Sequence, residues 1–95
     1  MSIGITIKNI LLGIESGCVF DSHYIVNQLV RNYSDEYLRF MSQYKDGARP
    51  TLTGHQMIGH AIKRFNGNIV ERLPYESWSE TIHGTYRPCA LWQRK

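Results

Sequence analysis

The clearest hydrophobic pattern in the chain lies in residues 51–67, TLTGHQMIGHAIKRFNG. Apolar residues follow one another there at i, i+3, i+4 and i+7, the spacing that lines one side of an α-helix. These residues are Ile58, Ala61, Ile62 and Phe65. Thr53 is placed to cap the first turn, and Gly67 is placed to end the helix in the left-handed conformation. The pattern predicts an amphipathic helix over residues 53–65.

The opposite side of this predicted helix has no carboxylate. Gln56, His60 and Lys63 follow at i, i+4 and i+7, and Arg64 lies close to them. Such a side can enter the major groove of DNA, because amide and cationic groups suit base edges and phosphates. An ordinary solvated surface explains the same residues. The sequence leaves both interpretations open.

The N-terminal segment carries a second helical stripe, and Gly17 is placed to end that helix. The stripe consists of Ile7, Ile10, Leu11 and Ile14. It predicts a helix over residues 6–16. Ile3, Ile5 and Ile7 also alternate as the residues of a strand do, so an extended start is the alternative.

Two helices that meet at a corner are predicted over residues 22–33 and 35–45. Asp21 is the expected cap of the first helix, and Ser34 is the expected cap of the second. Because a single capping residue separates them, the chain must turn sharply. Leu38 takes the N4 position of a hydrophobic staple, which a buried residue usually occupies.

The C-terminal third changes to an alternating pattern that predicts β-strands. Residues 68–73 form the first candidate strand, Pro74 interrupts it, and a hairpin follows that turns between His83 and Pro88. Helices followed by a hairpin indicate one α+β domain over residues 1–95, mainly helical with a C-terminal β-hairpin. The expected core is Ile10, Leu11, Ile14, Ile25, Leu29, Leu38, Met41, Ile58, Ile62 and Phe65.

Composition agrees with a single small globular domain. The 95 residues are 42% hydrophobic and 20% charged, which is ordinary for such a domain. No apolar run approaches the roughly 20 residues that cross a bilayer, and no basic region precedes an apolar one as in a signal peptide. We therefore expect a cytoplasmic protein without a membrane partner.

The net charge of +3 is unevenly distributed. Residues 1–48 contain four basic and five acidic residues, whereas residues 49–95 contain seven basic and three acidic ones. This asymmetry points to a polyanionic partner for the half that contains the helix over residues 53–65. Cys18 and Cys89 are far apart and belong to no CxxC motif, so a reduced, buried pair is expected.

The order of helices followed by a hairpin resembles the winged helix-turn-helix family, and more loosely the small winged-helix-like proteins of bacterial chromosomes and mobile elements. The resemblance covers roughly residues 6–93 and rests on three segments, FDSHYIVNQL, HQMIGHAIKRF and IHGTYRPCALW. One feature departs from the family, because the interval over residues 45–52 is longer than a tight helix-turn-helix turn.

The resemblance implies binding of duplex DNA, with the helix over residues 53–65 in the major groove and the hairpin on the backbone. Gln56 would then pair with adenine, Lys63 or Arg64 would reach guanine or phosphate, and Arg87 would neutralise a phosphate. Exposed polar and cationic side chains occur on every soluble protein, so an ordinary solvated surface also explains each of these residues.

Catalytic and metal-binding patterns are not found. No Gly-rich phosphate loop, HExxH motif or nucleophile elbow occurs. His55 and His60 point about 140° apart around a helix, which makes them poor ligands for one metal ion. His23 and His83 stand alone in the sequence. We therefore expect no enzyme activity, no metal ion and no cofactor.

A protein-interaction module or homodimer is the alternative function. The chain has more aromatic residues in its first half than one small core readily buries, so some of them could cover a partner. These residues are Tyr24, Tyr33, Tyr37, Phe40 and Tyr44. The surface decides between the two functions, since a basic strip favours nucleic acid and a flat aromatic patch favours protein.

Overall fold

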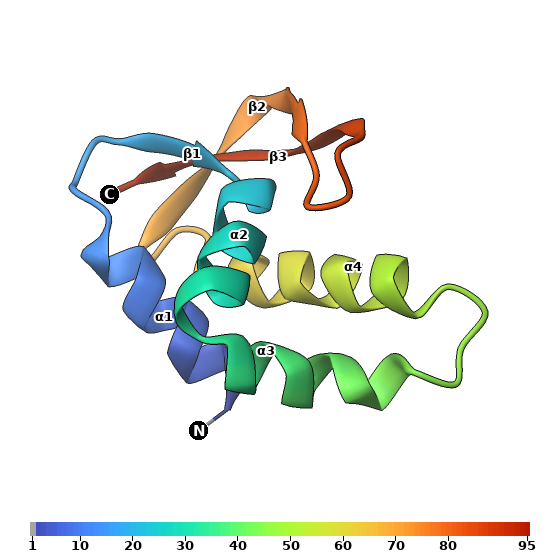
Figure 1. Cartoon of the computed structure of the whole chain (residues 1–95). Coiled ribbons are helices and arrows are strands. Elements are labelled where there is room, and N and C mark those ends of the chain that lie inside the picture. The colour runs from blue at the N-terminus through green and yellow to red at the C-terminus, as the bar shows by residue number, and fades with distance from the viewer. Residues whose placement is uncertain (1) are drawn as a thin grey trace.

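The computed structural model describes residues 2–95, which form four α-helices, one 3-10 helix and a three-stranded antiparallel sheet (Figure 1). The mainly helical α+β class predicted from the sequence, with strands at the C-terminus, is confirmed. The elements are α1 (Ile3–Gly13), β1 (Val19–Asp21), α2 (Ser22–Asn32), α3 (Ser34–Met41), η1 (Ser42–Tyr44), α4 (Pro50–Lys63), β2 (Val70–Glu80) and β3 (Tyr86–Arg94).

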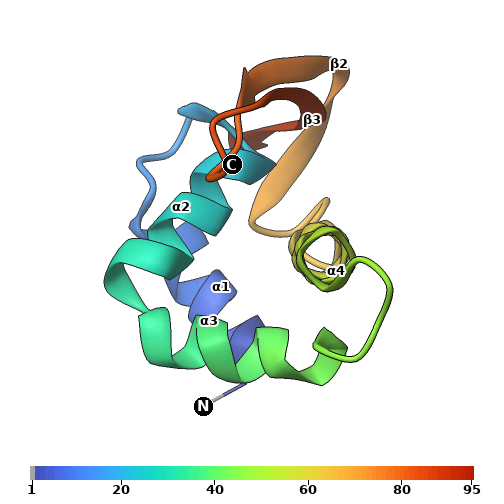
Figure 2. The same ribbon diagram turned by 45° about the vertical axis from the view of Figure 1, so that its right-hand side comes forward.

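The first helix, α1, packs against the other three α-helices, as the two ribbon views show together (Figures 1 and 2). It begins three residues earlier than predicted, because the Ser2 hydroxyl accepts a hydrogen bond from the backbone amide of Ile5. The alternative of an extended start is therefore wrong. The helix ends at Gly13, and Gly17 belongs to the turn that leads into β1 rather than to the helix end.

The predicted corner between the second and third helices is confirmed. The Asp21 carboxylate caps α2, as predicted, by accepting from the backbone amide of Tyr24 at 2.8 Å. Ser34, in contrast, lies inside α3, and the predicted cap at this residue is wrong. Tyr33 occupies the N-cap position without a side-chain hydrogen bond, and its backbone alone leaves the helical conformation between the two helices.

Leu38 is the clearest error in the expected core, since 64% of its surface is exposed. The third helix buries Tyr37 and directs Phe40 and Met41 toward the core. Leu38 follows Tyr37 by one position, which turns its side chain about 100° away from that stripe. Ile14, Met41 and Phe65 are partly buried against the core, and the other expected core residues are buried: Ile10, Leu11, Ile25, Leu29, Ile58 and Ile62.

The fourth helix, α4, begins at Pro50 and not after the predicted cap at Thr53. Proline suits the first helical position because it lacks the amide hydrogen that would have no partner there. Gly67 has the predicted left-handed conformation, with φ of 85°, but lies three residues past the C-cap Arg64. Gly54 on α4 leaves room for the end of the Met41 side chain, which a side-chain carbon at this position would displace.

The sheet has the order β1-β3-β2, so the last strand of the chain lies in the middle. No sequence pattern predicted β1, and the predicted break at Pro74 is wrong. In the structure β2 is continuous across a β-bulge between Arg72 and Glu76, where the ladder skips Pro74. The predicted hairpin is confirmed, although its turn comes slightly earlier, over residues 81–85.

Two substitutions test the assignment of the helical core. Ile62 is fully buried, so Ile62→Ala should lower the free energy of unfolding by about 2–5 kcal/mol. Leu38→Ala removes an exposed side chain and should change it by less than about 0.5 kcal/mol. Urea denaturation of both variants checks this, and similar losses in the two would show that the stripes are misassigned.

Candidate functional site

A groove of about 950 Å³ lies between α4 and the β2–β3 hairpin. Distant segments of the chain form this groove. The turn of the β2–β3 hairpin reaches toward α4, and β3 then returns to the middle of the sheet (Figure 1). The first residues of α2, Ser22 and His23, form its inner wall. The groove therefore unites the two segments that the sequence analysis connected with DNA binding.

The groove wall is basic. Of the described residues that line it, none is an aspartate or a glutamate. All four histidines of the chain contribute to the wall, and so do four cationic side chains. These eight residues are His23, His55, His60, His83, Arg49, Lys63, Arg72 and Arg87.

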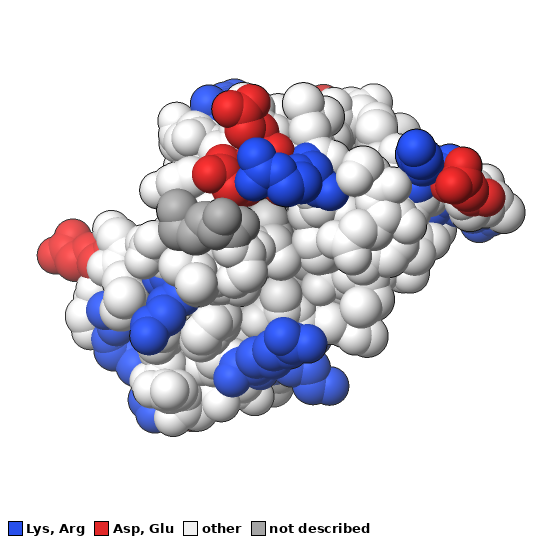
Figure 3. Space-filling view, turned by 90° about the horizontal axis from the view of Figure 1, so that it is seen from below, with Lys and Arg blue, Asp and Glu red and all other residues white. Residues whose placement is uncertain are grey.

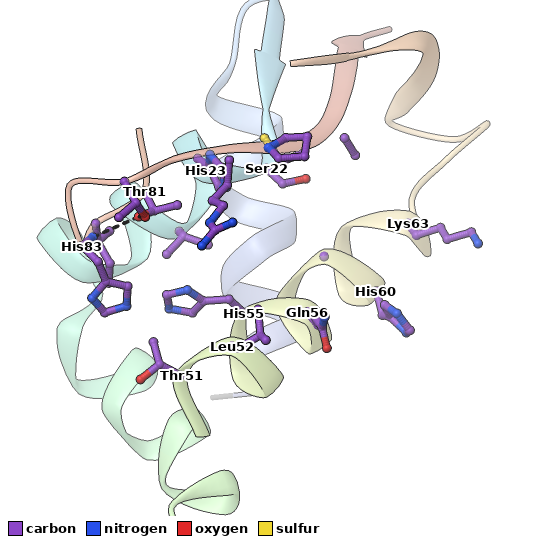
Figure 4. A pocket seen from close by; sticks show the side chains of 18 of the residues that line it. Ser22, His23, Thr51, Leu52, His55, Gln56, His60, Lys63, Thr81 and His83 are labelled. Atoms are coloured by element: carbon purple, nitrogen blue, oxygen red, sulfur yellow. Dashed lines mark hydrogen bonds between the residues drawn. The ribbon is translucent and has the colours of Figure 1, made fainter. Parts of the chain in front are cut away.

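Four of the five predicted site residues line this groove. Gln56, His60 and Lys63 follow one another along α4, and all three side chains are exposed (Figure 4). Arg87 belongs to β3 on the hairpin side. Arg64 is the C-cap of α4 and does not belong to the groove wall, although its side chain is exposed.

Three histidines from three different elements gather at one end of the groove. The rings of His23, His55 and His83 come from α2, α4 and the hairpin turn (Figure 4). The His55 and His83 rings stack with their centroids 6.2 Å apart. His55 Nε2 also lies 2.7 Å from the hydroxyl of Tyr37 on α3. Sequence spacing treated His23 and His83 as isolated, because only the return of the hairpin brings them near α4.

The environment of His55 favours its neutral form. Burial lowers the pKa of His55 below its ordinary value of 6.5, and the nearby His83 and His23 lower it further. Burial raises the pKa of Tyr37, so this residue stays a neutral phenol. A neutral imidazole and a phenol can share one hydrogen bond, and this bond connects α4 to α3 beside the groove.

Asp21, Ser22 and His23 each have a different partner. Asp21 caps α2, the Ser22 hydroxyl accepts from Trp92 Nε1 at 3.1 Å, and His23 Nδ1 lies 2.7 Å from Ser79 Oγ. These three consecutive residues therefore hydrogen-bond to three separate partners rather than in series. Their bonds instead attach α2 to both strands of the hairpin.

The two cysteines are free and lie in different environments. Cys18 is exposed, so the expectation of a buried pair is wrong for this residue. Cys89 is half-buried in the groove wall. Partial burial raises the pKa of the Cys89 thiol above its ordinary value, an effect that exceeds the lowering by the backbone amides of His23 and Ser22.

No protein-family model matches the chain, and comparisons with curated proteins and with solved structures return no match. Within residues 2–95, no helix combines the length and the apolar character that crossing a membrane requires.

The lowered pKa of His55 predicts a loss of stability in acid. Between the pKa of His55 in the folded protein and about 6.5, the unfolded chain binds more protons, so its population rises as the pH falls. The free energy of unfolding should fall from about pH 7.5 to about pH 5.5, and His55→Gln, which does not titrate, should lose less. His83, His23 and Tyr37, which surround His55, are unchanged in that variant.

Urea denaturation at the two pH values measures this difference. His60→Gln is the matched control, because it removes an exposed imidazole from the same helix. An equal acid-induced loss in the wild type and His55→Gln would contradict the prediction.

Proposed function

We propose that the protein binds DNA, with a duplex as the preferred form, through the groove between α4 and the hairpin. The observation that supports this most directly is the groove wall itself, where cations and imidazoles gather without a carboxylate. A polyanion gains most from such a surface, because each neutralised phosphate releases condensed counterions. A cytoplasmic, regulatory role on bacterial DNA belongs to the same proposal.

The exposed row on α4 would read the duplex. The Gln56 side-chain amide can form two hydrogen bonds with the edge of one adenine. Lys63 lies two turns farther along the helix, where it would meet the phosphates that line the major groove of the DNA. Arg87 would hold the backbone from the hairpin side. This arrangement gives base contacts to the helix and phosphate contacts to the hairpin, as in the winged-helix mode that the sequence resembles.

The cationic side chains of the groove wall differ in how firmly the protein holds them. The guanidinium of Arg72 lies over the Trp92 ring, 5.8 Å from its centroid, and donates to the backbone carbonyl of Tyr75. Arg72 therefore supplies charge to the groove while it holds the bulge of β2. Lys63 and Arg87 are exposed and are better placed to move toward a phosphate.

Other parts of the surface support the choice of the groove. Figure 3 shows the molecule from below, where Lys and Arg lie in separate groups with acidic residues beside some of them. Uncharged surface separates these groups. Such a face offers a phosphate backbone no continuous track.

Protein binding through the hairpin is the second candidate. Tyr75, Trp78 and Tyr86 are 72%, 67% and 69% exposed. Trp78 pairs with Pro88, two residues beyond Tyr86, so the Trp78 and Tyr86 side chains share one face of the hairpin. Of the aromatic residues that the sequence suggested for a partner, only Tyr24 is exposed, because Tyr37 is buried and Tyr33, Phe40 and Tyr44 are half-buried.

Salt-dependent binding of a labelled duplex tests the DNA proposal. The association constant should fall linearly with salt in a log–log plot between about 50 mM and about 200 mM. Lys63→Ala/Arg87→Ala should weaken binding and reduce the slope by about 2, since two phosphate contacts are lost. A single strand of the same sequence, tested in parallel, reports the preferred form.

Lys8→Ala/Arg31→Ala is the matched control, because it removes the same charge from exposed positions on α1 and α2 that lie outside the groove. This variant should keep the slope of the wild type. Arg64→Ala measures whether the contact extends past the groove. Absence of binding at low salt, or equal weakening by the two double variants, would reject the proposal and favour the aromatic face.

A further inference from the structure

Three potential metal ligands of different chemistry converge where α2 begins beside β3. A carboxylate oxygen of Asp21, a ring nitrogen of His23 and the sulfur of Cys89 all lie within 4.8 Å of one another. All three side chains are half-buried. Cys89 is far from the other two in sequence, so only the pairing of β3 with β1 and β2 brings the cluster together.

We propose that Asp21, His23 and Cys89 bind one zinc ion. Zinc accepts oxygen, nitrogen and sulfur ligands in tetrahedral geometry, whereas magnesium and calcium select oxygen alone. Three protein ligands leave a fourth position for a water molecule. The expectation of no metal ion rested on residue spacing in the sequence. That spacing does not show that Cys89 lies beside Asp21 and His23.

Neighbouring groups hold the Asp21 carboxylate in place. Asp21 accepts from the Tyr24 amide at 2.8 Å through Oδ1 and from the Ser77 hydroxyl at 2.9 Å through Oδ2. The bonds from Tyr24 and Ser77 fix the orientation of the carboxylate, as hydrogen bonds to metal ligands do. An ionised carboxylate has further lone pairs, so Asp21 can cap α2 and still bind a metal ion. The Ser79 hydroxyl lies 2.7 Å from His23 Nδ1 and 4.0 Å from the Cys89 sulfur, so it stands among the ligands and would have to turn away from any ligand atom that binds the ion.

The charges of the cluster suit a divalent cation. An ionised Cys89 thiolate and the Asp21 carboxylate together balance the charge of Zn²⁺, and His23 binds as a neutral ligand. Metal binding would release the thiol proton. Without a metal ion, burial and the Asp21 carboxylate raise the pKa of the Cys89 thiol, and the charge of a bound divalent cation would oppose both effects.

The proposed zinc site does not depend on DNA binding. His23 and Cys89 belong to the groove wall, whereas Asp21 does not. Since the metal experiments below contain no DNA, their failure and the failure of the DNA proposal are separate results.

Cobalt(II) and zinc titrations of the untagged, reduced protein test the site. Cobalt should produce the sulfur-to-metal absorption of a thiolate ligand and the visible bands of tetrahedral geometry, which reach saturation at one ion per chain. Zinc should then abolish these bands by displacing the cobalt. Absence of the bands, or a stoichiometry that does not saturate at one ion, would overturn the proposal.

Three variants assign the ligands. Cys89→Ser should abolish the sulfur-to-metal absorption, and Asp21→Asn should weaken zinc binding at least tenfold while its amide oxygen still caps α2. His23→Gln should weaken binding to a similar extent. The controls Cys18→Ser and His60→Gln remove the same residue types from exposed positions and should bind zinc as the wild type does.

A measurement on the unmodified chain covers the case in which a variant fails to fold. Zinc should slow alkylation of Cys89 at least tenfold, while the exposed Cys18 reacts at an unchanged rate. Mass analysis of the digested protein separates the two cysteines. Equal rates for Cys89 with and without zinc, or protection of Cys18 instead, would overturn the proposal.

Discussion

The structure depends on the insertion of β3 between β1 and β2. This C-terminal strand is the only one of the three described strands that pairs on both of its edges. Its Trp92 side chain is 2% exposed and donates to Ser22 at the start of α2. Arg94 Nε donates to the carbonyl of Leu11, which connects the same strand to α1. This strand therefore connects α1 and α2 to the middle of the sheet, and the hairpin that it forms with β2 reaches toward α4 (Figure 1).

Both proposed sites follow from this constraint. The groove exists because the hairpin turn reaches α4, where His83 stacks on His55. The ligand cluster exists because Cys89 on β3 lies against Asp21 and His23, which the chain places at the junction of β1 and α2. The two sites share the wall formed by His23 and Cys89. A change in how β3 pairs would thus alter both at once.

Sequence patterns predicted the local structure better than the contacts between distant segments. Helical stripes placed Ile25, Leu29, Ile58 and Ile62 in the core, because periodicity reports directly which side of a helix is buried. Leu38 was expected in the core because the predicted cap at Ser34 makes it the N4 residue, whereas the observed N-cap Tyr33 gives that position to the buried Tyr37. The strand β1 has only three residues and too short a pattern to detect. The cluster of Cys89 with Asp21 and His23 could not be predicted for a different reason. Residue spacing does not show which distant segments pair in a sheet, and it is strand pairing that brings Cys89 beside the other two.

We propose the groove between α4 and the hairpin as the functional surface of this protein, and backbone amide NMR spectra during titration with a short DNA duplex would locate the contact. If DNA enters the groove, the resonances of Gln56, His60, Lys63 and Arg87 should shift together, while those of Trp78 and Tyr86, which share the aromatic face of the hairpin, remain in place. Shifts confined to the aromatic face, with the groove resonances unmoved, would contradict the proposal.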